Sequence, residues 1–351
     1  MQTESLELLK TLIRTPSPSG FEEPVQRIVK KTLAGLADEV SSDVHGNVIG
    51  ARHPDGRPRV LLTGHADEIG LMIKYVNDEG YLYFQPIGSV PTYRLEGHRV
   101  TILNERGPAL GVIARKKPAD KEEAGKELKH HDFWIDIGAE GRAAAEARVA
   151  VGDPAVLDAD LAVLHGDRVI GRGFDDRIGV FIMLEVMRRL RGVTFDAAVY
   201  GVSMVQEEAG SRGAWTCAYN LAPEVGIAID VHETTDYPET DKRINGALAL
   251  GKGPILAKGT NFNPRLASLL VETAREHRIP YQFAGTPMPT WTDASVLQIA
   301  RGGSAACVVG VPLRYMHTSA EVIALSDVEH TIALLAGLIP KLTADLDFKP
   351  I

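Results

Sequence analysis

Five short apolar runs in the 351-residue chain each lead to a side chain that can bind a divalent metal ion. Glycine and proline bound these runs, which is typical of buried strands. The side chains that follow them are His65, Asp175, Glu207 with its neighbour Glu208, Asp230 and His317. In an open α/β sheet, binding sites form outside the carboxyl ends of the strands. Two histidines and several carboxylates at one such edge need a cation to neutralise them, so the pattern predicts a metal site, most simply that of a hydrolase.

The charge and the cysteine content argue against several other functions. The formal net charge is −8 with acidic and basic residues interspersed, which argues against binding to nucleic acid or to an anionic membrane surface. Two cysteines do not make a disulfide framework, so a reducing compartment is favoured. The N-terminus shows no secretory signal, and no apolar run reaches the roughly 18 residues that span a bilayer. We therefore expect a soluble, cytoplasmic protein.

The order of the expected strands and helices predicts two domains. From residue 69 to 164, short β segments alternate with glycine-containing turns, which suits a small barrel-like all-β domain. Its expected strands cover residues 71–75, 80–86, 99–102, 109–113 and 133–137. Residues 1–68 and 165–351 alternate strands with helices, which is typical of parallel strands in a doubly wound sheet. We expect an α/β fold with a doubly wound mixed sheet, into which the all-β domain is inserted.

Helices are expected at the start of the α/β domain and within it. Apolar residues at helical spacing predict a first helix over residues 5–13. Ser19 and Glu22 have the spacing of a capping box at the start of a second helix, which should end near residue 36. Further helices are expected over residues 178–190 and 264–277. The strongly charged segment 115–131 is interpreted as a solvated loop.

The acids beside the first two candidate ligands suggest supporting roles. His65 and Asp67 are two positions apart at a strand end, so their side chains can lie on the same side and pair. A metal-binding histidine commonly donates its second ring N–H to a carboxylate in this way. Asp175 stands at a strand-to-helix junction, where its two oxygens could bridge two cations while Asp176 pairs with Arg177 or caps the helix. The alternative, that both aspartates are only helix caps, stays open.

Glu207 and Glu208 are adjacent carboxylates at the expected tip of an apolar strand. If both are buried, each raises the pKa of the other. A division of roles is chemically natural, with one acid as a metal ligand and the other as a proton carrier. The pair His130 and His131, beside the charged segment, is interpreted as solvated and not as a metal site.

Taken together, these motifs resemble the M42 family of metallo-aminopeptidases, which includes the TET peptidases and the glutamyl aminopeptidases. The similarity extends over nearly the whole chain. The segments that carry it are Thr15-Pro-Ser-Pro-Ser-Gly-Phe-Glu22, Gly64-His-Ala-Asp-Glu-Ile-Gly70, Gly173-Phe-Asp-Asp-Arg177, Gln206-Glu-Glu208, Ile279-Pro-Tyr-Gln282, Thr292-Asp-Ala294 and Arg314-Tyr-Met-His317.

The resemblance implies two divalent metal ions per subunit, usually zinc or cobalt, with manganese also compatible with such ligands. One ion would be bound by His65, Asp175 and Asp230, and the other by Asp175, Glu208 and His317, with Asp175 bridging. The resemblance further implies that Glu207 is the general base and that Asp67 supports His65. The expected all-β domain would mediate dimerisation, and dimers would assemble into a dodecamer. The substrate would be a peptide, shortened from its N-terminus.

Three other functions remain as alternatives from the residues alone. An amidase or deacylase that acts on blocked termini could use the same metal core. A glycoside hydrolase needs two carboxyl groups on either side of one bond, which suits adjacent acids poorly. A scaffold that only retains metal has no use for a spare base such as Glu207. The preferred N-terminal residue is not predicted, although Met288, Trp291 and the segment around His232 are candidates to line its pocket.

Overall fold

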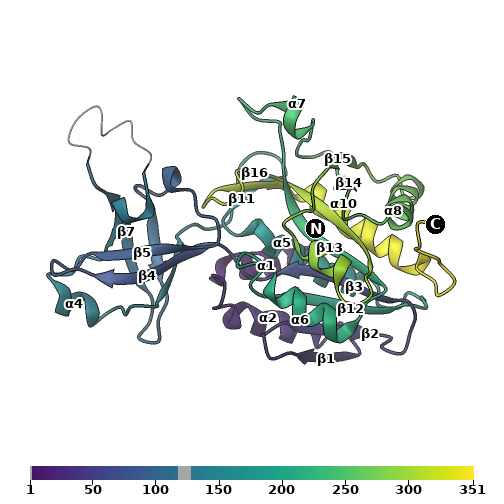
Figure 1. The fold of residues 1–351 in the computed structure, drawn as a ribbon, viewed down its shortest axis with the longest axis horizontal. Coiled ribbons are helices and arrows are strands. Elements are labelled where there is room, and N and C mark those ends of the chain that lie inside the picture. The colour runs from purple at the N-terminus through teal and green to yellow at the C-terminus, as the bar shows by residue number, and fades with distance from the viewer. Residues whose placement is uncertain (1, 118–127) are drawn as a thin grey trace.

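The computed structural model describes residues 2–117 and 128–351, which form two units joined side by side. Figure 1 shows an α/β unit with one large sheet, and beside it a smaller β-barrel at the far end of the elongated molecule. The expected fold class, a mixed α/β sheet with an inserted barrel, is confirmed. Most of the segment expected to be a charged loop, residues 118–127, lies outside the described residues. Among the described residues, no helix is both long and apolar enough to cross a membrane.

The large sheet has a parallel centre and antiparallel margins. The central strands run in the order β12 (Ala198–Met204), β3 (Arg59–His65), β13 (Val225–Glu233) and β16 (Ala305–Arg314), and each neighbouring pair is parallel. The remaining strands of this sheet are β1 (Glu39–Ser42), β2 (Val48–Arg52), β10 (Ala162–Val163), β11 (Arg168–Gly171), β14 (Ile255–Gly259), β15 (Gln282–Thr286) and β17 (Glu321–Ala324). Because β10 already pairs with β11, the chain has returned to the large sheet before residue 164.

The direction of β11 explains how Asp175 reaches the same sheet edge as the other candidate residues. Strand β11 is antiparallel to β17, and β17 is antiparallel to β16. Two such reversals leave β11 running in the same direction as β16, so the carboxyl ends of β3, β11, β13 and β16 point the same way. The sheet as a whole is mixed, as expected.

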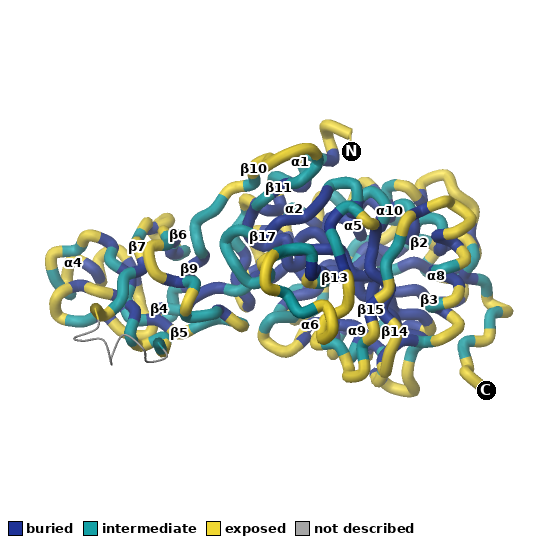
Figure 2. The backbone as a smooth tube through the Cα atoms, turned by 90° about the horizontal axis from the view of Figure 1, so that it is seen from above, coloured by how far each residue is buried: buried dark blue, intermediate teal, exposed yellow. Residues whose placement is uncertain are grey.

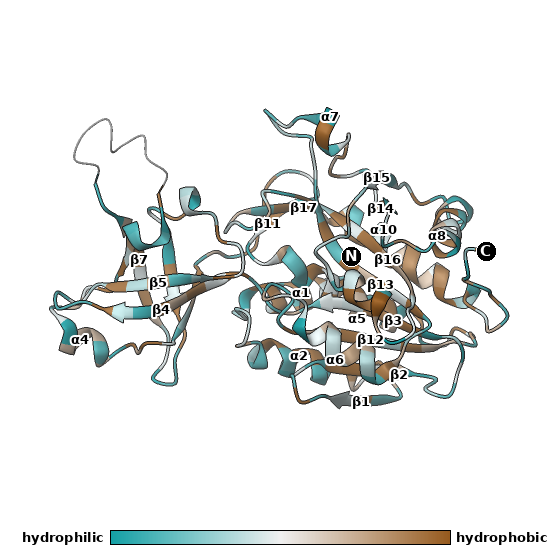
Figure 3. Ribbon diagram, viewed as in Figure 1, coloured by the Kyte–Doolittle hydropathy of each residue, from teal (hydrophilic) through white to brown (hydrophobic). Residues whose placement is uncertain are grey.

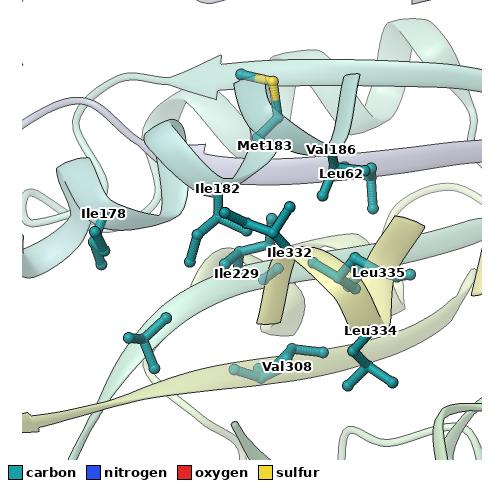
Figure 4. Close-up of a cluster of buried hydrophobic side chains, with 14 of the residues drawn as sticks. Leu62, Ile178, Ile182, Met183, Val186, Ile229, Val308, Ile332, Leu334 and Leu335 are labelled. Atoms are coloured by element: carbon teal, nitrogen blue, oxygen red, sulfur yellow. The ribbon is translucent and has the colours of Figure 1, made fainter. Parts of the chain in front are cut away.

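Helices cover both faces of this sheet because the residues of its central strands alternate between two apolar clusters. Leu62 packs with residues of α5 (Phe174–Arg189), while its neighbour Leu61 packs against α6 (Arg212–Leu221) and α9 (Asp293–Ile299). Figure 4 shows Ile182 of α5 and Ile332 of α10 (Leu325–Leu338) beside strand residues of the main cluster. The other helices are α7 (Lys242–Asn245), α8 (Pro264–Glu276) and the short 3-10 turn η3 (Ile339–Lys341). Burial and apolar residues both concentrate in the central strands (Figures 2 and 3).

The two N-terminal helices are α1 (Thr3–Arg14) and α2 (Glu23–Leu33), and the capping box expected at the start of α2 is wrong. Glu22 makes no side-chain cap bond to α2. Its Oε1 instead accepts the backbone N–H groups of Gly20 and Gln206, at 2.8 and 3.1 Å. The Ser19 hydroxyl donates to Asp67 Oδ2 at 2.6 Å. Both side chains therefore bind the loops around the candidate site, an arrangement that local spacing does not reveal.

The barrel closes in the order β4 (Gly70–Val76), β5 (Leu82–Ile87), β8 (Phe133–Asp136), β7 (Ala109–Arg115), β6 (Arg99–Ile102) and β9 (Pro154–Leu157). It has its own apolar core, which includes Leu71, Phe84 and Ile135. Strand β9 was not predicted; it begins at a proline, a residue that argues against a strand. The barrel also carries α4 (Arg142–Glu146) and the 3-10 turns η1 (Thr92–Arg94) and η2 (His130–Asp132).

Candidate metal centre

The residues expected to bind metal meet at the carboxyl edge of the large sheet. Among the described residues, two sets of side chains are arranged so that their ligand atoms lie within 4.8 Å of one another. The first set is His65, Asp175 and Asp230, and the second is Asp175, Glu208 and His317. Asp175 belongs to both sets. These are the groupings that the family resemblance implies for the two ions.

Strand pairing brings His65 and Asp230 together. His65 is the last residue of β3, and Asp230 lies inside β13, which extends further than its apolar run suggests. In the register of these parallel strands, Ala228 pairs with Thr63, and two further residues on each strand lead to Asp230 and His65. Residues two apart on a strand share a face of the sheet. Asp230 and His65 are therefore neighbours on one face.

Asp175 reaches the site because the chain is not helical at the start of α5. Asp175 and Asp176 have φ/ψ angles of −76°/105° and −122°/38°, and regular helix follows them. The Asp176 carboxylate accepts the backbone N–H of His65 at 3.1 Å and that of Gly179 at 3.0 Å, so it caps the regular helix and joins it to β3. Asp176 does not pair with Arg177, whose guanidinium contacts Glu68 instead.

The carboxylate of Asp175 lies between the two histidines. Its Oδ1 is 3.1 Å from Nε2 of His65, and its Oδ2 is 3.2 Å from Nε2 of His317. The same nitrogen of His317 lies 3.4 Å from Oε1 of Glu208. One carboxylate that presents each oxygen to a different imidazole has the arrangement of a bridging ligand. The donors, imidazole nitrogen and carboxylate oxygen, suit zinc, cobalt or manganese.

The charges at this site need balancing. Burial raises the pKa of Asp230 to about 8, and the nearby Asp175 adds to the shift. Burial alone would also raise the pKa of Asp175, but contacts with His317 and His65 hold it below its ordinary value. Burial opposes a charge on His317, yet hydrogen bonds to Asp175 and Glu208 raise its pKa to about 11. The protein thus gathers more buried acids than its two histidines can neutralise, which fits a site for cations.

Glu207 lies beside these sets and belongs to neither of them. Its Oε2 is 3.8 Å from Nε2 of His65, and its Oε1 accepts a hydrogen bond from the Ser211 hydroxyl at 3.3 Å. Burial raises its pKa well above the ordinary value, and the negative charges of Asp230 and Asp293 add to the effect. Glu207 is therefore a largely buried acid that lies at the site without belonging to either set of candidate ligands.

Asp67 organises the strand end and the glutamate loop together. Its carboxylate is fully buried, with Oδ1 3.3 Å from Nδ1 of His65, and the backbone carbonyl oxygen of Asp67 lies 3.1 Å from the same nitrogen. It also accepts the backbone N–H groups of Glu207 and Glu208, at 2.9 and 3.1 Å. The pairing with His65 expected from sequence is present in the structure. The bonds to the glutamate backbone were not expected.

Two further buried carboxylates bind the backbone of this site, and sequence reasoning missed both roles. Glu321, at the start of β17, accepts the backbone N–H of Asp175 at 3.2 Å and that of His317 at 3.1 Å. Glu22 accepts the backbone N–H of Gln206, as described above. Glu321 directly precedes the apolar run Val-Ile-Ala, and this position at a strand end could have indicated that it lies at the site. Nothing local indicates the distant partners of Glu22.

Several non-glycine residues near the site have left-handed backbone conformations. Gln206, Ser211 and His317 have φ angles of 56°, 51° and 58°. Each such residue costs of order 1–3 kcal/mol and persists only where its surroundings enforce it. Here the N–H groups of Gln206 and His317 are bound by Glu22 and Glu321, and that of Ser211 donates to the Glu207 carbonyl oxygen. The buried carboxylates thus stabilise the strained loops that present Glu207, Glu208 and His317.

A pocket of about 670 Å³ opens onto these residues. Besides the candidate ligands and Glu207, its lining includes His232, Ile255, Ala257, Val308, Gly310 and Trp291. Met288 is exposed and does not line it.

A larger hollow of about 1030 Å³ lies between α2, the β1–β2 hairpin and the barrel, and none of the candidate ligands lines it. His130 and His131 lie elsewhere, with the His130 ring 3.0 Å from the Val90 carbonyl oxygen.

Several known proteins with similar sequences and structures are described as aminopeptidases or peptidases. Residues 46–334 match the family model described as M42 glutamyl aminopeptidase. The lysyl aminopeptidase of Pyrococcus furiosus is 36% identical over 98% of this chain and 99% of its own. The TET aminopeptidase of a marine-sediment archaeon of the Thaumarchaeota superposes with a TM-score of 0.93 at 35% identity, and 97% of each chain is covered. The TET1 peptidase of Pyrococcus horikoshii gives a TM-score of 0.85 at 31% identity, over 96% of this chain and 100% of its own.

Proposed function

We propose, from the premise that this chain belongs to the M42 family of aminopeptidases, that it removes N-terminal residues from peptides with two divalent metal ions and Glu207 as the general base. His65, Asp175 and Asp230 would bind one ion, and Asp175, Glu208 and His317 the other. The observation that carries this proposal is the carboxylate of Asp175, with one oxygen 3.1 Å from His65 and the other 3.2 Å from His317.

The chemistry divides between the ions and the acid beside them. Bound at these two sets of ligands, divalent ions lower the pKa of a water molecule and stabilise negative charge on a carbonyl oxygen. Glu207 accepts the proton of the attacking water and then donates it to the departing amide nitrogen. Its raised pKa favours this role, because burial and nearby acids make its carboxylate a better proton acceptor. Ser211, which donates to Oε1, keeps the other oxygen directed towards the site.

Asp67 acts on the reaction through other residues. Its contact with Nδ1 of His65 fixes the ring so that Nε2 faces Asp175. Its bonds to the N–H groups of Glu207 and Glu208 fix the loop that carries the base and one ligand. We therefore assign Asp67 a positioning role.

The assembly and the metal are further parts of the proposal. The TET1 peptidase of Pyrococcus horikoshii is described as assembling into a tetrahedron or a large octahedral shell. By analogy, this chain forms a homo-oligomer in which the inserted domain, residues 69–164, mediates dimerisation and dimers build a dodecamer. Zinc or cobalt is the expected metal, with manganese as the third choice. The cytoplasmic location stays a prediction.

The proposal is tested with aminoacyl p-nitroanilides, before and after treatment with a chelator and after addition of zinc, cobalt or manganese. Hydrolysis should disappear with chelation and return with at least one metal. N-acetylated peptides and a cellulose substrate, assayed in parallel, represent the deacylase and the glycoside hydrolase. Hydrolysis of either of these, without hydrolysis of any substrate that has a free amine, would contradict the aminopeptidase assignment.

A further inference from the structure

Three adjacent strands, β13, β14 and β16, bound one side of the pocket beside the candidate metal centre, and their buried lining residues Ile255, Ala257 and Val308 are called its closed end. Asp230 on β13 is paired with Gly310 on β16, and Gly310 is paired with Ile255 on β14. A side chain at position 310 would have its Cβ 2.9 Å from the Cβ of His232 and 3.4 Å from that of Ile255. Only glycine fits at this position without displacing His232 or Ile255, so the three strands pack closely beside Asp230.

The closed end is apolar. Ile255, Ala257 and Val308 line the pocket and are 1%, 7% and 5% exposed. Of the described residues that line the pocket, every charged or titratable one is a candidate ligand or Glu207, with the exception of His232. No lysine, arginine or additional carboxylate is among those lining residues. A charged substrate side chain would find no partner of opposite charge here.

The contrast between buried and exposed lining residues indicates which part of a peptide enters the closed end. The part of the substrate that follows its N-terminal residue can be of any length, so it must extend out of the pocket through an open side. Ser89, Gly210 and Trp291 line the pocket and are exposed, so they mark its mouth. The side chain of the N-terminal residue is short and fits an enclosed space. It therefore occupies the closed end formed by Ile255, Ala257 and Val308.

Burial without a partner penalises a charged side chain strongly. Transfer of an unpaired charge from water into an apolar site costs several kcal/mol or more, whereas an aliphatic side chain gains free energy there. The family model is described as glutamyl aminopeptidase, and the Pyrococcus furiosus relative as lysyl aminopeptidase. Neither a glutamate nor a lysine side chain finds a complementary charge at the closed end of this pocket.

We propose that this enzyme selects peptides with an uncharged aliphatic N-terminal residue, such as leucine or methionine, over those that begin with lysine or glutamate. The inference rests on the proposed aminopeptidase function and specifies its substrate class. Ile255, Ala257, Val308 and Gly310 determine the preference.

The first test compares kcat/KM for p-nitroanilides of leucine, methionine, lysine and glutamate with the metal-loaded wild-type enzyme. At pH 8 an ordinary imidazole is uncharged, so His232 does not add a positive charge to the pocket. We expect kcat/KM for the leucine or methionine substrate to be about 100-fold, and at least 10-fold, higher than for the lysine and glutamate substrates. If kcat/KM for the better aliphatic substrate is less than 10-fold higher than for lysine or for glutamate, the inference is overturned while the aminopeptidase function stands. Absence of hydrolysis with all four substrates would instead contradict the proposed function itself.

The second test places a negative charge at the closed end. Ala257→Asp should raise the ratio of lysine to leucine kcat/KM by at least 10-fold, because the new carboxylate pairs with the substrate ammonium. Thr286→Asp, at a half-buried lining residue, is a second variant in case the first does not fold. The matched control is Ala247→Asp, at an exposed residue that does not line the pocket and should leave the ratio unchanged. An unchanged ratio in a folded, metal-loaded pocket variant would overturn the inference.

Discussion

The carboxylate of Asp67 accepts a hydrogen bond from the backbone N–H of Glu207 at 2.9 Å. One fully buried acid therefore fixes the backbone of the proposed general base, and through its other contacts it fixes the ring of His65 as well. The aspartate is two residues from the histidine in sequence and 140 residues from the glutamate. Replacement of Asp67 should therefore slow the reaction, although its side chain is buried behind His65 and the glutamate loop.

Asp67→Asn keeps the shape of the side chain but replaces one acceptor oxygen with an amide donor. We expect kcat to fall about 10- to 100-fold, the range seen when partners of metal ligands are changed. Because Asp67 does not contact the substrate, KM should change much less than kcat. Steady-state kinetics together with metal analysis check this prediction. A 10- to 100-fold rise in KM with an unchanged kcat would instead show that Asp67 contributes to substrate binding.

Glu207→Gln removes the proton acceptor and leaves both sets of candidate ligands intact. The variant should lose about 10²- to 10⁴-fold in kcat, the usual contribution of a general base, and keep nearly normal metal content. Glu208→Gln is the informative comparison, since it alters a candidate ligand and should lower the metal content. If Glu207→Gln lost metal to the same extent as Glu208→Gln, the division of roles between these neighbours would be wrong.

Glu321→Gln tests the carboxylate that joins Asp175 to His317 through their backbone N–H groups. An amide has one acceptor oxygen where the carboxylate has two, so one of the two backbone bonds is lost. We expect metal affinity to fall about 10- to 100-fold while the thermal unfolding temperature of the metal-free protein changes little. Titration calorimetry with the metal measures the affinity. Glu272→Gln on the exposed face of α8 is the control, and equal affinities in the two variants would exclude a positioning role for Glu321.

Glu68 supports a prediction about stability and pH. It is buried, its Oε2 lies 3.1 Å from Nε of Arg172, and its Oε1 contacts the buried Arg177. Burial alone would raise the pKa of Glu68, but the two arginines hold it below the ordinary value. Its stabilising contribution is therefore complete above the unfolded pKa of about 4.3 and is lost as pH falls through the lower folded value.

Glu68→Gln should accordingly lower the free energy of unfolding at pH 7 by about 3–5 kcal/mol, because it removes the carboxylate that neutralises the buried guanidinium groups of Arg172 and Arg177. The difference from wild type should shrink as pH falls below about 4. Denaturant unfolding curves at several pH values provide the measurement. Glu7→Gln, which removes only an exposed pair with Lys10, should cost less than about 1 kcal/mol. A difference for Glu68→Gln that does not depend on pH would argue against the ionised pair.

Much of the fold could be predicted from the sequence, because its patterns are local. The apolar runs before His65 and Glu207 form β3 and β12, and the five expected barrel strands correspond to β4, β5, β6, β7 and β8. Errors occurred where the partners are distant. Ser19 and Glu22 have capping-box spacing, but their side chains bind Asp67 and the backbone of Gln206. No local rule distinguishes these two outcomes.

The candidate site shows the same limit. The sequence shows which side chains follow apolar runs. Because the carboxyl ends of parallel strands share one edge of the sheet, these side chains could be predicted to meet there. The division of those side chains into two sets came from the family resemblance and not from spacing. The carboxylates that bind backbone N–H groups, Glu321 and Glu22, were missed because their partners lie in loops far away or in left-handed conformations.

The central claim, that Asp175 bridges two metal ions, is tested most directly by anomalous diffraction from crystals grown with cobalt or zinc. The account predicts two peaks, one beside His65, Asp175 and Asp230 and the other beside Asp175, Glu208 and His317, each about 2.0–2.2 Å from its imidazole nitrogen and carboxylate oxygens. A single peak, or two peaks of which one lies away from Asp175, would contradict it.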